Sequence, residues 1–247
     1  MKRRIFLSLA GGLLLRQVVP AVAAPEAEAC PVPAELMEVP VKLPHVAERL
    51  RRGHKLTIVA IGGASTAGAA AGAPDLAYPH RLQLALAALY PEVAVNVVNK
   101  GVPRQLAQQM VERFPSDVLA EEPTLVVWET GTVDAVRDIE IDELAAALQS
   151  GIDLVKNRAI DILLVDMQFS RRTSTLINFD RYLQAVHRAG EVNEVYVFPR
   201  FAMMRYWSEQ KLFNFDEVSD GERARLAAKV YDCIGRKLAE AIQVATK

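Results

Sequence analysis

Lys55-Leu-Thr-Ile-Val-Ala-Ile-Gly-Gly-Ala-Ser-Thr-Ala-Gly68 joins an apolar, β-branched run to a turn of small residues. A pattern typical of a helix begins soon afterwards, at Tyr78. A buried strand that ends in such a turn is how the first strand of an α/β domain presents a loop to a ligand or a reaction centre. The stretch therefore predicts the first strand of an α/β domain and a functional loop after it.

Further strands and helices alternate along the rest of the chain. Strands are predicted at 93–98, 124–128, 160–165 and 194–198, and helices at 45–52, 78–90, 106–119, 141–157, 179–189 and 222–244. The segment 200–219 is predicted as a loop. Alternation at this spacing favours a parallel five-stranded sheet with helices on both faces. We expect a three-layer α/β/α sandwich of flavodoxin-like layout over residues 51–247, preceded by a proline-rich arm at 24–50.

Composition excludes some classes of function. The 247 residues are 51% hydrophobic and carry a formal net charge of -1, which is enough apolar material for a full core. A nucleic-acid-binding protein would need a basic face, and acids and bases are interspersed here. The sequence predicts no nucleic acid partner, no cofactor and no metal.

The first 23 residues have the pattern of an export signal. A basic start is followed by an apolar run at 5–15 and by small residues that end at Ala23. The run is too short to span a bilayer, so the mature chain is expected without a membrane span, in the periplasm or outside the cell. Arg3 and Arg4 favour the twin-arginine route, whereas Lys2 before them is atypical and leaves general secretion as the alternative.

Two cysteines, Cys30 and Cys233, remain after the predicted cleavage. In an oxidising compartment they are candidates for a disulfide that would fasten the arm to the last helix. Closing so long a loop would stabilise the fold by ~4 kcal/mol in the chain-entropy model. The alternative is a buried Cys233 and a free Cys30 on a mobile arm.

Three loops after successive strands carry a recognisable combination of residues. They are 61–68 (IGGASTAG), 98–102 (VNKGV) and 127–134 (VWETGTVD), and Asp216 follows near the end of the chain. In order and spacing these blocks resemble the SGNH (GDSL-type) hydrolase family. The resemblance implies ester hydrolysis by a serine nucleophile, a histidine base three residues after an aspartate, and an oxyanion hole from backbone N–H groups and an asparagine.

The first block does not place a serine where the resemblance requires it. The family motif Gly-Asp-Ser-x-Thr-x-Gly, laid on residues 62–68, matches Thr66 and Gly68 and puts Ala64 at the nucleophile position. A register shifted by one residue would make Ser65 the nucleophile, but it loses both of those matches. We favour the register with Ala64, and Ser65 remains the alternative.

The later blocks are also incomplete. Gly101 keeps the glycine whose N–H would contribute to the oxyanion hole. In 131–134 (GTVD), Thr132 precedes Val133, which replaces the asparagine, and Asp134 follows. In 216–219 (DEVS), Ser219 occupies the place of the histidine base, and no histidine follows His187.

His187 itself is expected to be solvated in the middle of a helix. Arg200 is expected as ordinary surface charge. Glu129, Asp134 and Asp216 could gather at the cleft as acid, base or metal ligands, although solvated or capping roles are the commoner fate of such carboxylates.

The combined losses predict a degenerate hydrolase that acts as a binding or accessory protein in the cell envelope. Its expected partner is an acylated glycan or lipid, or an envelope protein. The alternative is an active esterase or acyltransferase on an acylated glycan or lipid, with Ser65 as nucleophile and Asp216 among its catalytic residues.

Overall fold

The computed structural model describes residues 30–214 and 219–247, apart from the side chains of Arg172 and Asp220. Its centre is a parallel five-stranded sheet in the order β2-β1-β3-β4-β5. The strands are β1 (Leu56–Gly62), β2 (Val95–Gly101), β3 (Leu125–Glu129), β4 (Asp161–Val165) and β5 (Tyr196–Phe198). This order is the flavodoxin-like one, so the predicted α/β/α architecture is confirmed.

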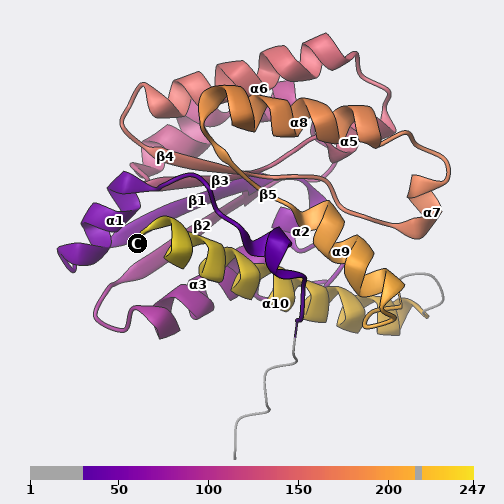
Figure 1. Ribbon diagram of the computed structural model, residues 1–247, viewed down its shortest axis with the longest axis horizontal. Coiled ribbons are helices and arrows are strands. Elements are labelled where there is room, and N and C mark those ends of the chain that lie inside the picture. Colours follow the sequence, from indigo (N-terminus) through magenta and orange to yellow (C-terminus); the bar gives the residue numbers. More distant parts are fainter. Residues whose placement is uncertain (1–29, 215–218) are drawn as a thin grey trace, which may run out of the picture.

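Helices cover both faces of the sheet. Figure 1 shows α6 and α8 over one face and α3 and α10 over the other. The helices are α1 (Pro44–Arg51), α2 (Ala64–Ala67), α3 (Tyr78–Leu89), α4 (Ala107–Glu112), α5 (Thr132–Val136), α6 (Ile141–Lys156), α7 (Arg171–Ser174), α8 (Asp180–Asn193), α9 (Arg200–Glu209) and α10 (Asp220–Ala245). Within the described ranges, none of them is both long and apolar enough to cross a membrane.

The central strands are buried on both faces, as their sequences require. Every residue of β3 and β4 is buried, whereas the edge strand β2 is only partly covered. Uninterrupted runs such as Val126–Trp128 are typical of parallel strands that are sandwiched between helix layers. Runs of β-branched and other apolar residues therefore predicted the central strands of the sheet more accurately than its edge strands.

Several predicted elements have different bounds, and two of the differences have a structural explanation. The second strand was expected to end at residue 98, but its pairing with β1 continues to Gly62 and Gly101. The helix expected at 106–119 ends at Glu112 in the structure and is followed by a π-helical turn at Phe114–Val118. Pro115 explains that break, because proline lacks an N–H and its ring clashes with the preceding helical turn.

The segment 200–219 is not a simple loop, so that prediction was wrong. Its first half forms α9, which buries Phe201, Met203 and Trp207. Basic and polar residues interrupt the apolar ones at irregular spacing, so a clear helical period is absent from the sequence. Phe201 packs against Phe169 and Phe179, and Trp207 is hydrogen-bonded to the arm, so tertiary contacts stabilise α9.

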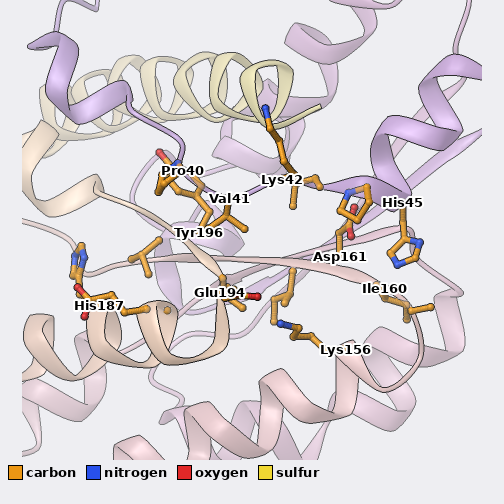
Figure 2. A pocket seen from close by; sticks show the side chains of 18 of the residues that line it. Pro40, Val41, Lys42, His45, Lys156, Ile160, Asp161, His187, Glu194 and Tyr196 are labelled. Atoms are coloured by element: carbon orange, nitrogen blue, oxygen red, sulfur yellow. The ribbon is translucent and has the colours of Figure 1, made fainter. Parts of the chain in front are cut away.

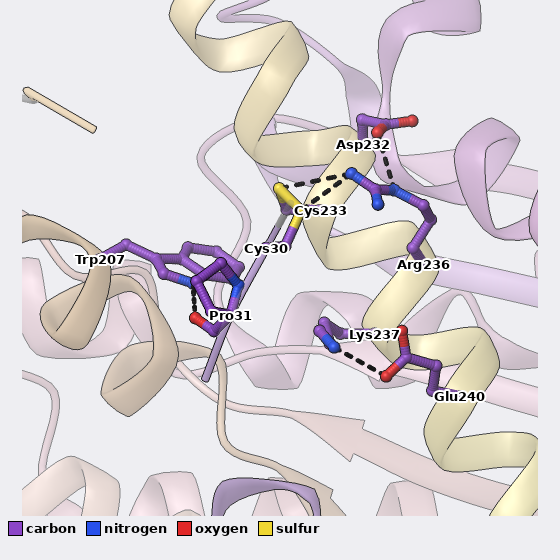
Figure 3. Close-up of a disulfide and its surroundings, with 8 residues drawn as sticks. All are labelled: Cys30, Pro31, Trp207, Asp232, Cys233, Arg236, Lys237 and Glu240. Carbon is purple, nitrogen blue, oxygen red and sulfur yellow. Dashed lines mark hydrogen bonds and ion pairs between the residues drawn. A yellow bond between two sulfur atoms is a disulfide. The ribbon is translucent and has the colours of Figure 1, made fainter. Parts of the chain in front are cut away.

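The arm is fastened to α9 and α10 along its length. Cys30 forms a disulfide with Cys233 of α10, and the Trp207 indole Nε1 donates to the Pro31 carbonyl oxygen at 2.8 Å (Figure 3). A single 3₁₀ turn (Ala34–Met37) follows. At the far end, the Leu43 N–H donates to the Ala245 carbonyl oxygen at 3.0 Å. The arm is thus part of the folded body in the described range.

Candidate functional site

The carboxyl ends of β1, β2 and β3 bring the three predicted loops together. Gly62 at the end of β1 pairs with Gly101 at the end of β2, and α2 lies directly beside that junction. A Cβ on Gly101 would lie 2.2 Å from the Ala67 nitrogen and 2.6 Å from the Thr66 carbonyl carbon. Glycine is therefore needed at 101 because two backbones approach closely there.

Ala64 and Ser65 face different environments. Ala64 is exposed at the first position of α2, whereas Ser65 is only 5% exposed. The Ser65 Oγ donates to the Gln168 Oε1 at 2.7 Å. Burial raises the pKa of the Tyr231 phenol, and a hydrogen bond with Ser65 partly offsets that rise. Among the described residues, no histidine or carboxylate is hydrogen-bonded to Ser65, so neutral groups hold its hydroxyl.

Thr66 anchors the turn to a buried ion pair. Its N–H and its hydroxyl both donate to the Glu129 Oε2, at 3.1 and 2.5 Å. The Tyr78 hydroxyl lies 3.0 Å from the Thr66 Oγ1, and burial raises the pKa of Tyr78. The other oxygen of Glu129 accepts from Arg200 Nη2 at 3.2 Å, and both side chains are almost fully buried. Glu129 therefore has a structural role, because it binds both Thr66 and Arg200. The prediction that Arg200 is an ordinary surface charge was wrong, since its side chain is buried.

The Gly101 N–H already has an acceptor within the protein. It donates to the Asn99 Oδ1 at 2.9 Å, and the Asn99 Nδ2 donates to the Thr66 carbonyl oxygen at 2.6 Å. A free oxyanion donor would need to point at the ligand without such a partner. Asn99 instead uses this amide to fasten β2 to α2.

The residues of the third block serve the packing of neighbouring helices. Both carboxylate oxygens of Asp134 accept from the Ala107 N–H, at 3.1 and 3.2 Å, so Asp134 caps the start of α4. Burial raises the pKa of Asp134. The Thr132 Oγ1 accepts from the Gln168 N–H at 3.3 Å, and Val133 beside it is half-buried. Asp134 is thus a capping residue.

The fourth block is described from Ser219 onwards. Asp216 lies outside the described residues. Ser219 is exposed and begins α10, where its Oγ and its N–H donate to Glu222 at 2.5 and 3.0 Å. These hydrogen bonds lower the pKa of Glu222. Ser219 and Glu222 together form a capping box. In the described part of the chain, no group of three histidine, cysteine, aspartate or glutamate side chains could hold a metal.

His187 is not simply solvated, which corrects the expectation from sequence. Its Nε2 lies 3.1 Å from the Asp166 Oδ2, and the Asp166 Oδ1 accepts from the Phe201 N–H at 2.8 Å. The hydrogen bond with Asp166 raises the pKa of His187, and the charges of Asp166 and Glu191 add to it against partial burial. Burial also raises the pKa of Asp166, and the hydrogen bond from His187 offsets only part of that effect.

Sequence reasoning did not identify Gln168 or Tyr231. Gln168 follows β4 at the edge of the sheet where function was expected, so its place along the chain was a usable signal. Tyr231 lies inside α10, and its proximity to Ser65 depends on how that helix packs. Nothing in the local sequence points to it.

The geometry agrees with a comparison to known families. A model of the non-GDSL lipase-like family matches residues 29–247. The chain belongs to that family, and the predicted kinship with SGNH (GDSL-type) hydrolases is confirmed in family and fold. No curated protein matches the chain in sequence.

Solved structures with the same fold include several esterases. A two-domain esterase active on acetylated mannans is 17% identical, with a TM-score of 0.63 over 83% of this chain and 55% of its own. A catalytic mutant of an acetylxylan esterase from Geobacillus stearothermophilus is 20% identical, with a TM-score of 0.58 over 77% of this chain and 94% of its own. A protein of the G-D-S-L family from Desulfitobacterium hafniense DCB-2 is 23% identical, with a TM-score of 0.50 over 58% of this chain and 76% of its own. Because all three structures are less than 25% identical to this chain, their likeness establishes only that the chain shares their fold.

Glu129→Gln should strongly destabilise the fold. The substitution removes the negative charge next to buried Arg200, and breaking such a pair typically costs about 3–5 kcal/mol. Urea unfolding measures the loss. Glu129→Gln combined with Arg200→Met should recover part of it, because no unpaired charge is then buried. Wild-type stability in the Glu129→Gln protein would contradict the structural role of Glu129.

His187→Gln should lower stability at about pH 6 and have a much smaller effect at about pH 9. His187 and Asp166 both have raised pKa values, so the folded state holds protons more tightly than the unfolded state. The stability contributed by His187 is present below its ordinary pKa and is lost as pH rises through the higher folded value. Thermal unfolding across this range, with exposed His54→Gln as the control, measures the difference. An effect of His187→Gln that is independent of pH would rule out the charged pair.

Proposed function

We propose that this chain is a catalytically degenerate member of its family that binds an acylated glycan without hydrolysing it. One observation carries the proposal. The exposed residue at the start of α2, where the family motif places the nucleophile, is Ala64, and the neighbouring Ser65 hydroxyl is buried against Gln168. A buried hydroxyl without a basic partner is a poor nucleophile.

Two other features of the candidate site support loss of catalysis. The Val133 side chain cannot donate a hydrogen bond to an oxyanion, and the Gly101 N–H is engaged by Asn99. Ser219, which replaces the base, is engaged as a helix cap with Glu222. Loss of one group from a triad already lowers the rate by several powers of ten. The simultaneous absence of three groups favours binding over turnover.

The ligand class follows from the related structures. The two-domain relative is active on acetylated mannans, and the Geobacillus relative is an acetylxylan esterase. The carboxyl edge of the sheet, where ligands bind in open α/β folds, is well placed for an acetylated glycan. An acylated lipid or an envelope protein is the alternative ligand.

The proposal includes export to the cell envelope. We assign residues 1–23 as the signal, 24–50 as the arm and 51–247 as the domain that carries the cleft. The basic and apolar pattern before Ala23 supports this division. The disulfide between Cys30 and Cys233 suits an oxidising compartment such as the periplasm.

An active esterase that uses Ser65 is the second candidate. It is favoured by the position of Ser65 directly after β1, at the carboxyl edge of the sheet where ligands bind in open α/β folds. This candidate needs the Ser65 hydroxyl to leave Gln168 and to gain a base, for which Asp216 is the available residue of the family motif.

The wild-type protein should hydrolyse p-nitrophenyl acetate no faster than its Ser65→Ala variant. Release of p-nitrophenol, followed over a range of pH, is the measurement, and circular dichroism confirms that both proteins are folded. Robust turnover that disappears in Ser65→Ala would establish that the protein is an esterase with Ser65 as its nucleophile. It would overturn the proposal that catalysis has been lost. As a positive control, Ala64→Ser combined with Val133→Asn and Ser219→His restores the family residues at the three positions.

A further inference from the structure

A guanidinium group lies against the disulfide that joins the arm to α10 (Figure 3). The Arg236 Nη2 is 2.9 Å from the Cys30 Sγ and 3.8 Å from the Cys233 Sγ. A disulfide sulfur is uncharged and only a weak acceptor, so this contact stabilises the oxidised protein slightly. A cation beside a sulfur stabilises a thiolate much more, and a disulfide is reduced more readily when its reduced form is stabilised.

Arg236 stays beside Cys233 when the disulfide opens. Both residues belong to α10, three positions apart, and side chains at that spacing lie on the same face of a helix. Helix α10 packs along α3, a contact in which the arm takes no part. The Arg236 Nε donates to the Asp232 Oδ2 at 2.9 Å, which holds the guanidinium in place and offsets part of its charge. A Cys233 thiolate would therefore form next to a cation that is already positioned.

Reduction of the disulfide needs two electrons, and a dithiol is a class of reductant that supplies them. One thiolate of the dithiol would attack the Cys30 Sγ, the bond between Cys30 and Cys233 would break, and Cys233 would leave as a thiolate beside Arg236. The second thiol of the dithiol then displaces Cys30, so the dithiol is oxidised to a disulfide. Of the two protons that the dithiol loses, one goes to Cys30 and the other to solvent. Attack at Cys30 is the more accessible route, because Cys30 is 6% exposed and Cys233 only 1%.

Reduction would release one end of the arm. The Trp207 indole donates to the carbonyl oxygen of Pro31, which directly follows Cys30, so this hydrogen bond depends on the disulfide. The other end of the arm has an attachment of its own, because the Leu43 N–H donates to the Ala245 carbonyl oxygen at 3.0 Å. Opening the disulfide therefore frees the segment around Pro31 and leaves the far attachment in place.

The arm contacts two parts of the domain that its release would affect. Residues 38–44 form one wall of a cavity of about 850 Å³, which is also lined by residues of α8 and β5 (Figure 2). Next to the disulfide the arm is bonded to α9, whose first residue, Arg200, is paired with Glu129. Release of the arm would thus loosen a cavity wall and the helix that holds Glu129 in the candidate site.

We propose that the disulfide between Cys30 and Cys233 is a releasable strap, and that Arg236 favours its reduction by stabilising the Cys233 thiolate. In the oxidised protein the strap holds the arm against α9 and α10. In the reduced protein the arm leaves α9 at Pro31 while the fold persists. This device does not depend on the function proposed for the carboxyl edge of the sheet.

Equilibration of the folded protein in mixtures of reduced and oxidised dithiothreitol tests the role of Arg236. Alkylation of the thiols and mass spectrometry give the fraction that is reduced. Arg236→Gln should lower the equilibrium constant for reduction by about tenfold, the value of one hydrogen bond to a charged group. Arg236→Lys keeps the charge and should retain most of the wild-type value. Asp232→Asn removes the carboxylate that offsets the guanidinium and should raise the constant.

Lys237→Gln is the matched control. Lys237 is the next residue of α10, and its Nζ is paired with the Glu240 Oε2 at 2.8 Å (Figure 3). Its replacement removes one positive charge from the same helix without removing the contact with the sulfurs, so the constant should stay unchanged. An unchanged constant in Arg236→Gln, or an equal fall in Lys237→Gln, would overturn the role of Arg236.

Tryptophan fluorescence tests the release of the arm. The chain has two tryptophans, and Trp128 packs against Phe114 in the core, so a change on reduction reports on Trp207. Reduction should shift the emission, Trp207→Phe should abolish the shift, and Cys30→Ser should show the reduced emission without any reductant. Circular dichroism should stay the same in both redox states. Unchanged emission on reduction, or loss of the helical circular dichroism signal, would overturn the proposal of a local strap.

Discussion

The buried ion pair between Glu129 and Arg200 fixes the carboxyl edge of the sheet. Taking two charges out of water costs several kcal/mol per ion, and the pair is tolerable only when further hydrogen bonds satisfy it. Thr66 supplies them, because its N–H and its hydroxyl both reach Glu129. One carboxylate at the end of β3 thereby holds the turn after β1 and the helix after β5. Loops from three separate parts of the sequence have their relative positions set by this contact.

The orientation of the residues beside Thr66 follows from that constraint. With Thr66 directed inward to Glu129, Ala64 at the start of α2 is exposed, and Ser65 is buried beside Gln168 and Tyr231. To attack a substrate, the Ser65 hydroxyl would have to give up its hydrogen bond to Gln168. The chain therefore has the fold of its family, and the Ser65 hydroxyl is hydrogen-bonded within the protein.

The sequence was informative where local patterns determine structure. Runs such as Val126–Trp128 predicted the buried strands. It was uninformative where the outcome depends on distant contacts. Glu129 is of a residue type that often acts as a catalytic acid. Its structural role instead depends on Arg200, which lies 71 residues away in the sequence. Helix α9 has no clear period, and no local pattern reveals that Tyr231 lies beside Ser65.

Reaction with a fluorophosphonate, which modifies activated serines covalently, tests the central claim most directly. The claim is that the Ser65 hydroxyl is a buried structural group without a base. After incubation of the folded protein with the reagent, peptide mass spectrometry reads out the peptide that contains Ser65. The account predicts no adduct at Ser65. Stoichiometric modification of Ser65 in the native protein, absent after denaturation, would contradict it and identify an activated nucleophile.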